Sequence, residues 1–237
     1  MKVAIHQPQY LPWLGYLAKW AAADLFIVLD VVQYEKNGWQ TRNRVKTADG
    51  ARWLTVPVHA ALGTPISEVA VDNSQPWPAR HLRAIEQAYA RTPGLAAHHE
   101  ALRRFYATPW TRLAPLATAS ACWLAESFGI TTPIRLASDL GVTKSDPTGR
   151  LVALCQAVGA DTYLAGPHGA EYMDLDQFAA AGLEVRVQRY EHPVYPQGHR
   201  AFVPQLSALD LLLTSGNRGF AILQQGNGWT RLLDRRP

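Results

Sequence analysis

The spacing of apolar and polar residues predicts alternating strands and helices at the start of the chain. Residues 2–5 are an apolar stretch with the length of a buried strand, and residues 13–23 place apolar side chains on one helical face. Residues 24–29 form a continuous apolar run, as expected for a parallel strand that is covered on both faces. We therefore expect the chain to open as a β-α-β unit.

The pattern then changes to three consecutive helices. Residues 78–91 have helical periodicity, and Thr92 followed by Pro93 is typical of a helix start. The third helix, 111–128, is apolar nearly all round and is therefore expected to be buried. We expect a helical segment at 75–130 within a single domain that spans 1–237.

The remaining pattern predicts further strands and helices. Strands are expected at 52–58, 66–71, 133–137, 162–165 and 183–189, and helices at 147–158, 175–181 and 206–213. Alternation of this kind is typical of an α/β fold. We predict a mostly parallel, doubly wound sheet with a helical middle segment.

The expected topology predicts where a ligand would bind. If the strands share one sheet, right-handed crossovers bring their carboxyl ends to the same edge, where open α/β sheets bind ligands. The residues that follow strands, and so would gather there, are His6, Gln7, Asp30, 138–139, 166–169 and 191–192.

Residues 6–13 combine a histidine and a tyrosine with two prolines, which fix the backbone. A histidine on a rigid turn at a strand end suits general-base catalysis or a hydrogen bond to phosphate. The alternative is a histidine satisfied by the backbone beneath packed aromatic rings. The density of polar groups favours function, so we predict His6 as a catalytic base, with Gln7 and Tyr10 contacting substrate.

The polar stretch 30–44 follows the second strand and is predicted as a loop. Its arginines offer planar groups for carboxylate or phosphate, its amides suit polar atoms, and its aromatic rings can stack on a sugar or base. Asp30 is the second predicted catalytic residue, able to orient a base, hold a metal or bind a ribose hydroxyl. The alternative is a solvated loop with two anchoring aromatic side chains. The predicted substrate contacts are Gln33, Lys36, Trp39, Arg42, Asn43 and Arg44.

Two later segments contribute weaker candidates. A glycine-rich loop contains His168, and residues 192–197 repeat the composition of the first motif. Each has an equally good structural interpretation, as an ordinary loop and as a rigid proline-rich turn. We add His168, His192, Tyr195 and Gln197 to the predicted substrate contacts.

Composition narrows the class of protein. The net charge of +4, from 23 basic and 19 acidic residues, suits an anionic substrate, and no basic run resembles a nucleic-acid-binding tail. The two cysteines lie in predicted helices without metal-ligand spacing, so we expect core residues and no metal site. No apolar run reaches the roughly 18 residues that span a bilayer. The first apolar stretch meets His6 too early for a signal peptide, so we expect a cytoplasmic protein.

The sequence leaves the cofactor open. Neither a P-loop nor a dinucleotide-binding glycine motif occurs. The order strand, histidine loop and helix is similar to that of nucleotidylyltransferases and class I synthetases, but residues 13–16 lack both histidines of their HxGH signature. ATP or a nucleotide-linked substrate therefore stays an option.

The chain resembles the WbqC-like protein family. The resemblance rests on the pattern HQPxYxPWxGY at 6–16, on WQxRN at 39–43, and on further matches at 53–58, 195–197 and 207–212. Val31 departs from an expected aspartate, which argues against a metal site built on paired aspartates, and Thr41 departs from an expected asparagine. The resemblance implies a role in surface-polysaccharide or specialised-metabolite biosynthesis, with amino sugars or other small amines as substrates.

The leading hypothesis is a transferase that forms an amide or other acyl bond on a small amine or amino sugar, which is anionic or nucleotide-linked. His6 would deprotonate the amine and Asp30 would orient it. The alternatives are ATP-dependent adenylation or ligation, aminoacyl transfer from tRNA, and non-catalytic ligand binding. The tRNA alternative uses a basic face formed by Arg80, Arg83, Arg103, Arg104 and Arg112.

Overall fold

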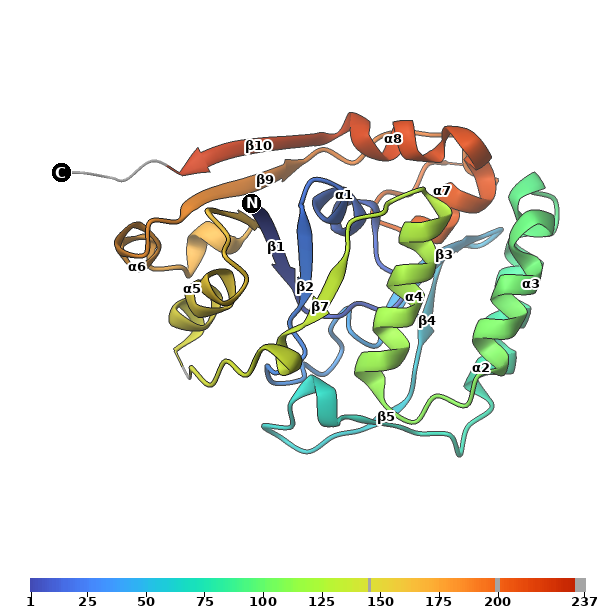
Figure 1. Cartoon of the computed structure of the whole chain (residues 1–237). Coiled ribbons are helices and arrows are strands. Elements are labelled where there is room, and N and C mark those ends of the chain that lie inside the picture. Colours follow the sequence, from blue (N-terminus) through green and yellow to red (C-terminus); the bar gives the residue numbers. More distant parts are fainter. Residues whose placement is uncertain (145, 199–200, 233–237) are drawn as a thin grey trace.

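A computed structural model describes residues 1–144, 146–198 and 201–232 of the chain, and a six-stranded sheet lies at its centre (Figure 1). Its strands, in spatial order, are β10 (Asn227–Leu232), β9 (Glu184–Tyr190), β8 (Thr162–Ala165), β1 (Lys2–His6), β2 (Leu25–Val28) and β7 (Ile134–Leu136). Five of the strands are parallel, and β10 pairs antiparallel with β9 at one edge. The predicted mixed α/β fold with a mostly parallel sheet is therefore confirmed.

The helices follow the predicted order. They are α1 (Leu14–Ala21), α2 (Trp77–Tyr89), α3 (Pro93–Ala107), α4 (Leu113–Ser127), α5 (Pro147–Ala157), α6 (Leu175–Ala180), α7 (Ala208–Ser215) and α8 (Gly219–Gln225). Short 3₁₀ turns lie at Ile66–Glu68, Ala137–Leu140, Gly169–Glu171 and Gly216–Arg218. Helices α2 to α4 form the predicted helical middle segment. No helix in the part of the chain that the structure describes is long and apolar enough to cross a membrane.

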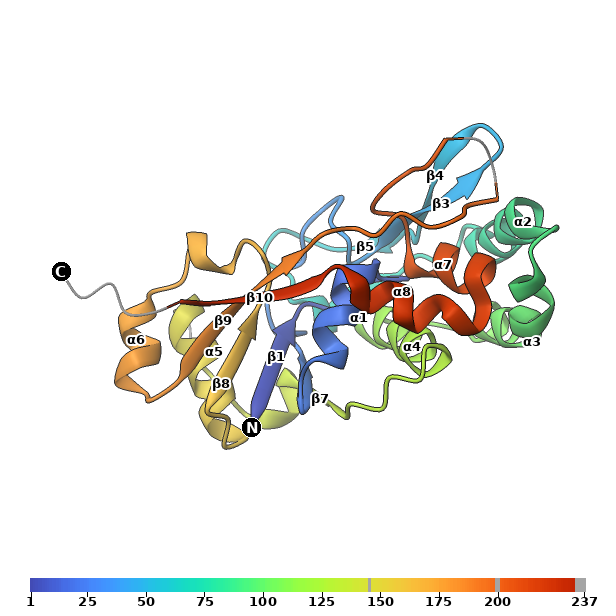
Figure 2. The same ribbon diagram turned by 90° about the horizontal axis from the view of Figure 1, so that it is seen from above.

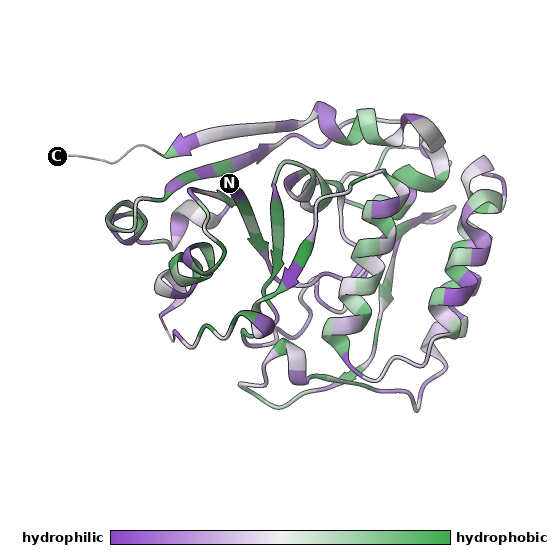
Figure 3. Cartoon of the chain, viewed as in Figure 1, coloured by the Kyte–Doolittle hydropathy of each residue, from purple (hydrophilic) through white to green (hydrophobic). Residues whose placement is uncertain are grey.

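Alternation along β1 assigns its side chains to the two faces of the sheet. Val3 and Ile5 pack in the hydrophobic cluster that contains α5 and α6, whereas Ala4 packs in the larger cluster with α1, α4 and α7. Because side chains alternate along a strand, His6 lies on the same face as Ala4, toward α1. Figure 2 shows the two layers of helices on either side of the strands, and Figure 3 shows that the inner strands are the most hydrophobic.

The chain order creates a switch point between β1 and β8. From β1 the chain proceeds outward through β2 to β7, and then returns to build β8 and β9 on the other side of β1. Right-handed crossovers therefore place α1 and α4 on one face and α5 and α6 on the other. Ligands of open α/β sheets bind at such a switch point, outside the carboxyl ends of the strands.

Residues 30–71 depart from the prediction, because they build two small antiparallel ladders outside the main sheet. Strands β3 (Arg42–Thr47) and β4 (Gly50–Thr55) form a hairpin, and β5 (Val58–His59) pairs with β6 (Ala70–Val71). The predicted loop to residue 44 was wrong at its end, where β3 has begun. The strand predicted at 52–58 is split at Pro57, which has no amide hydrogen for a ladder. The strand predicted at 66–71 begins as a 3₁₀ turn.

Candidate functional site

His6 ends β1 at the switch point and presents a defined tautomer. Its Nδ1 lies 3.1 Å from the carbonyl oxygen of Gln7. A carbonyl can only accept, so Nδ1 carries the hydrogen and a neutral ring keeps its lone pair on Nε2. Burial, and then the positive charge of Lys19, hold the pKa of His6 well below 6.5, while the bond to Gln7 opposes this. His6 is therefore a neutral base at neutral pH, and its ring packs edge-to-face with that of Tyr16.

Lys19 is the first of three residues near this site that the sequence did not identify. Its side chain is 1% exposed, and Nζ donates to the carbonyl oxygen of Ile5 at 3.0 Å. A Cβ placed on Gly166 would lie 3.9 Å from Nζ, so the amine sits between the ends of β1 and β8. Burial lowers the pKa of Lys19 to about 7. No carboxylate among the described residues pairs with it. The sequence does distinguish Lys19, because it is the one charged residue within the predicted helix 13–23.

Gln7 connects His6 to the loop that follows β2. Gln40 Nε2 donates to Gln7 Oε1 at 2.7 Å, and Gln40 Oε1 accepts from the Glu35 amide at 3.0 Å. The backbone amide of Tyr10 also donates to the carbonyl oxygen of Trp39. These bonds join the histidine turn to residues 35–40, and Gln40 was not among the predicted contacts.

Four side chains of this loop and of the β3–β4 hairpin form what we call the tryptophan–arginine platform: Trp39, Arg42, Arg44 and Trp53. The guanidinium carbons of Arg42 and Arg44 lie 4.4 and 5.5 Å from the centre of the Trp53 ring, and Trp39 packs beside it at 5.6 Å. Trp39 and Trp53 are 38% and 43% exposed. The Nε atoms of both arginines are buried without a partner among the described residues.

The platform combines stacking surface with two cations, which suits a ring attached to an anionic group. Strand register explains the arrangement, because Arg44 lies opposite Trp53 in the hairpin. The sequence identified Trp39 and both arginines but missed Trp53, whose position on the exposed face of β4 depends on that register.

Asp30 links strand ends. Its side chain is 2% exposed, and its two carboxylate oxygens accept from the amide and the hydroxyl of Ser138 at 3.0 and 2.7 Å. Its carbonyl oxygen accepts from the amide of Ser67. Asp30 thus holds the end of β2 to the turn after β7, which is a positioning arrangement.

Tyr10 and Asn43 lie inside the protein. The Tyr10 hydroxyl bonds His81 Nδ1 at 2.9 Å and the Tyr106 hydroxyl at 2.6 Å, and burial lowers the pKa of His81 to about 4. Asn43 Nδ2 donates to the carbonyl oxygen of Leu11, whose φ of 45° is unusual for a residue with a side chain. These side chains shape the turn after His6, and their polar atoms are already bonded within the protein.

His192, Tyr195 and Gln197 lie together in the segment after β9. His192 Nδ1 lies 3.1 Å from the Pro193 carbonyl oxygen, and burial lowers the pKa of His192. Its Nε2 is buried without a hydrogen-bond partner in the part of the chain that the structure describes. The Tyr195 hydroxyl is also buried, and its polar neighbours are the buried Asp210 carboxylate and Gln197. Gln197 accepts from Lys46 Nζ at 3.0 Å and from the amide of Val203 at 2.9 Å, so it anchors this segment to β3.

Three predicted contacts stay outside this arrangement. Gln33 is exposed and forms an isolated bridge with Pro65, and Lys36 lies in an exposed turn. The His168 side chain is 83% exposed and pairs with Glu171 at 2.9 Å. Within the described part of the chain, no hydrogen bond or ring contact joins these three residues to His6.

Comparison with known proteins places the chain in a family. The profile of the WbqC-like protein family matches residues 7–222. A curated relative from Mycobacterium tuberculosis (strain ATCC 25618 / H37Rv), named "Uncharacterized protein Rv1507c", is 35% identical over 220 residues, which cover 91% of this chain and 94% of the relative. No solved structure matches the chain. The chain belongs to the WbqC-like protein family.

Proposed function

We propose that this protein is a biosynthetic transferase that joins an acyl group to a small amine or amino sugar at the carboxyl edge between β1 and β8. The observation that carries the proposal is the neutral imidazole of His6, which has its lone pair on Nε2 and lies at the switch point of the sheet. Polar and titratable groups gathered at such an edge are typical of a reaction site.

In the proposed step the amine nitrogen attacks the acyl carbonyl carbon, a C–N bond forms, and the bond from that carbon to the leaving group breaks. His6 Nε2 takes the proton from the amine and passes it to the leaving group. A protonated imidazole has no lone pair for this step, so the low pKa of His6 keeps the base active at neutral pH. Lys19 contributes to that low pKa through its charge.

The tryptophan–arginine platform supports an anionic, ring-containing substrate such as a nucleotide-linked amino sugar. Arg42 and Arg44 would bind its phosphate groups, while Trp53 and Trp39 would stack on its base or sugar. The Gln40–Gln7 bond connects this platform to His6. Asp30 would position the strand end that faces the substrate.

Incubation with amino sugars, nucleotide-linked amino sugars and a panel of acyl donors, followed by mass spectrometry, tests the proposal. We expect an amide product with at least one pair of substrates, and a higher KM with little change in kcat for Arg42→Gln. The exposed Lys36→Gln is the matched control and should leave KM unchanged. Saturable binding of an amino sugar that never yields product with any donor class would contradict the proposal and favour a binding protein.

A further inference from the structure

A basic groove lies between β4 and α2, next to the tryptophan–arginine platform. Two adjoining cavities of about 570 and 300 Å³ share the residues Arg52, Ala84 and Gln87. Arg80 and Arg83 line the smaller cavity, and Trp53 lines the larger one. Arg80, Arg83, Ala84 and Gln87 have the spacing i, i+3, i+4, i+7, so they form one stripe along α2. We call this the α2–β4 groove.

The charge of the chain is concentrated at this segment. Residues 75–112 contain six arginines, no lysine and two glutamates, which gives +4 and equals the net charge of the whole chain. Glu86 is already bonded by His99 at 2.8 Å. Arg52 and Arg83 are exposed, and no carboxylate in the described ranges pairs with either. The groove wall itself contributes three arginines and one acidic residue, Asp49.

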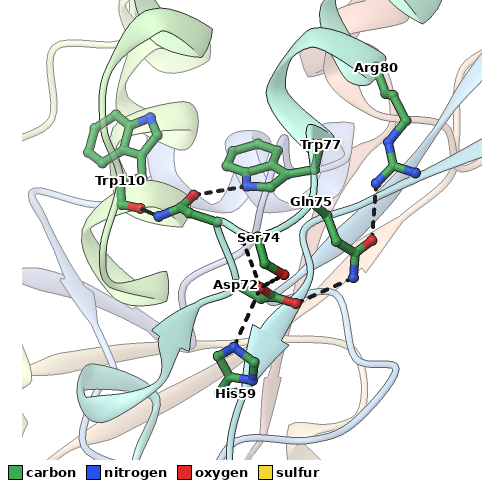
Figure 4. Close-up of polar contacts among 8 residues, drawn as sticks. His59, Asp72, Ser74, Gln75, Trp77, Arg80 and Trp110 are labelled. Atoms are coloured by element: carbon green, nitrogen blue, oxygen red, sulfur yellow. Dashed lines mark hydrogen bonds and ion pairs between the residues drawn. The ribbon is translucent and has the colours of Figure 1, made fainter.

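Arg80 is held in place by the turn that precedes α2 (Figure 4). Its guanidinium donates to Gln75 Oε1 at 3.0 Å, and Gln75 Nε2 donates to Asp72 Oδ2 at 3.3 Å. Asp72 also accepts from the amide and hydroxyl of Ser74, which hold the pKa of this carboxyl below its usual value. The Asp72 carboxylate is thus used by the turn, and one side of the Arg80 guanidinium is fixed.

A chain of contacts links the groove to the residue beside His6. Trp53 belongs both to the groove and to the platform, where it packs against Trp39. The next residue, Gln40, bonds Gln7 beside His6. Trp53 is thus the aromatic residue that the groove and the platform share.

Arginines along a groove that ends on exposed aromatic rings are typical of sites for single-stranded nucleic acid, where phosphates pair with the cations and bases stack. A membrane surface fits less well, because it needs a broader apolar surface than the groove offers. The exposed large apolar side chains there, among the described residues, are Trp53 and the adjoining Trp39. A single small anion would leave most of the two cavities and part of the charge unused.

We propose that the α2–β4 groove binds a single-stranded nucleic acid, with its phosphates on Arg52, Arg80 and Arg83 and a terminal base on Trp53. Nucleic-acid binding stands independently, and its link to acyl transfer rests on the proposed function. An acyl group esterified to the terminal ribose hydroxyl would then face His6. Attack by the amine would break the ester C–O bond, and the hydroxyl would receive the proton from His6.

Fluorescence anisotropy with labelled RNA and DNA strands of the same sequence, about 12 nucleotides long, tests the proposal. Affinity is measured at several salt concentrations between about 50 and 200 mM. We expect the wild type to bind, and the variant Arg52→Gln/Arg80→Gln/Arg83→Gln to reduce the slope of log K against log salt by about 2, since each contact to a single strand contributes about 0.7. Trp53→Ala should weaken binding by roughly tenfold.

The matched control is Arg135→Gln/Arg186→Gln/Arg218→Gln, which removes three exposed arginines elsewhere and should keep the slope. Thermal melting of each variant confirms that it is folded. Either tighter binding of RNA than of DNA or equal binding of both supports nucleic-acid binding in the groove. Tighter binding of RNA also supports an acyl group on the terminal ribose. Absent binding to either strand at the lowest salt, or an equal loss in the control variant, would overturn the proposal. So would binding to anionic vesicles alone.

His6→Gln separates this proposal from the proposed function. It should leave nucleic-acid affinity unchanged, because His6 lies outside the groove. If the wild-type protein binds nucleic acid but forms no amide, the groove proposal stands and the transferase proposal fails. If it forms an amide but binds no nucleic acid, the transferase proposal stands and the groove proposal fails.

Discussion

Two segments of similar composition, each with a histidine, a proline and a tyrosine, follow parallel strands of the same sheet and share one local geometry. His6 to Tyr10 follows β1, and His192 to Tyr195 follows β9. In both, the histidine Nδ1 lies 3.1 Å from the carbonyl oxygen of the next residue, which fixes the same tautomer. Burial lowers the pKa of both imidazoles.

The segments differ in the position of their strand in the sheet and in the side chains that neighbour the histidine. His6 ends an inner strand at the switch point and has the buried amine of Lys19 as a neighbour. His192 follows an outer parallel strand and packs among the rings of Tyr190, Tyr195 and Phe202. Local sequence therefore sets the tautomer, whereas the position in the sheet supplies the charge and the strand edge. For this reason the proposed base is His6, and His192 is its natural control.

The largest expected effect comes from replacing each histidine. His6→Gln removes the proposed base and should lower kcat by about 10²- to 10⁴-fold, as is usual for general-base catalysis. His192→Gln should lower kcat less than about tenfold. The measurement is kcat of both variants with the same amine and acyl donor. Equal decreases in kcat would contradict the distinction between the two segments.

Lys19→Met tests the burial of the Lys19 amine beside His6 through the pH dependence of the free energy of unfolding. The wild-type amine has its pKa lowered from 10.5 to about 7, so the unfolded chain binds a proton that the folded protein does not bind between these pH values. Wild-type stability therefore rises with pH across this range, by on the order of 4 kcal/mol for this group. The variant lacks that rise, so the free energy of unfolding of the wild type minus that of the variant should increase by the same amount between pH 7 and pH 10.5.

Urea unfolding of wild type and Lys19→Met at pH 7 and at pH 10.5 measures this difference. The exposed Lys36→Met is the control and should follow the wild-type curve. Parallel curves for wild type and Lys19→Met would show that the amine is hydrated.

Tyr10 and Tyr195, one in each segment, should differ by a smaller amount in their contribution to the free energy of unfolding. The Tyr10 hydroxyl has two buried hydrogen-bond partners in good geometry, whereas the Tyr195 hydroxyl lies near the Asp210 carboxylate and Gln197 without such a bond. Tyr10→Phe leaves those partners unsatisfied and should cost about 1–3 kcal/mol, while Tyr195→Phe removes a weaker contact and should cost less. Thermal melts of both variants check the order, and the reverse order would contradict the hydrogen-bond assignment.

The order of strands and helices could be predicted because local patterns encode it. Apolar runs at β1 and β2 are typical of covered parallel strands, and the start of α3 is visible as Thr92-Pro93. The gathering of His6 and His192 on one edge followed from topology alone. Strand β10 was not predicted, because its mostly half-buried residues at the sheet edge lack a clear apolar alternation.

Partners far away in the sequence explain most of the remaining differences. Tyr10 was predicted to contact substrate, but its hydroxyl bonds residues 71 and 96 positions away. Asp30 bonds Ser138, which is 108 positions away. Neither pairing leaves a local pattern. The β3–β4 hairpin was missed in part because its exposed face is built from arginines and a tryptophan, which resemble a polar loop until strand register pairs them.

The most direct test of the central claim is the protonation state of His6, read from nitrogen-15 and proton NMR of the imidazole as the pH is lowered. We predict a neutral ring with its hydrogen on Nδ1 at pH 7 and a pKa well below 6.5. In Lys19→Met that pKa should rise while the pKa of His192 stays unchanged. A His6 ring that is charged at pH 7, or that carries its hydrogen on Nε2, would contradict its role as the base.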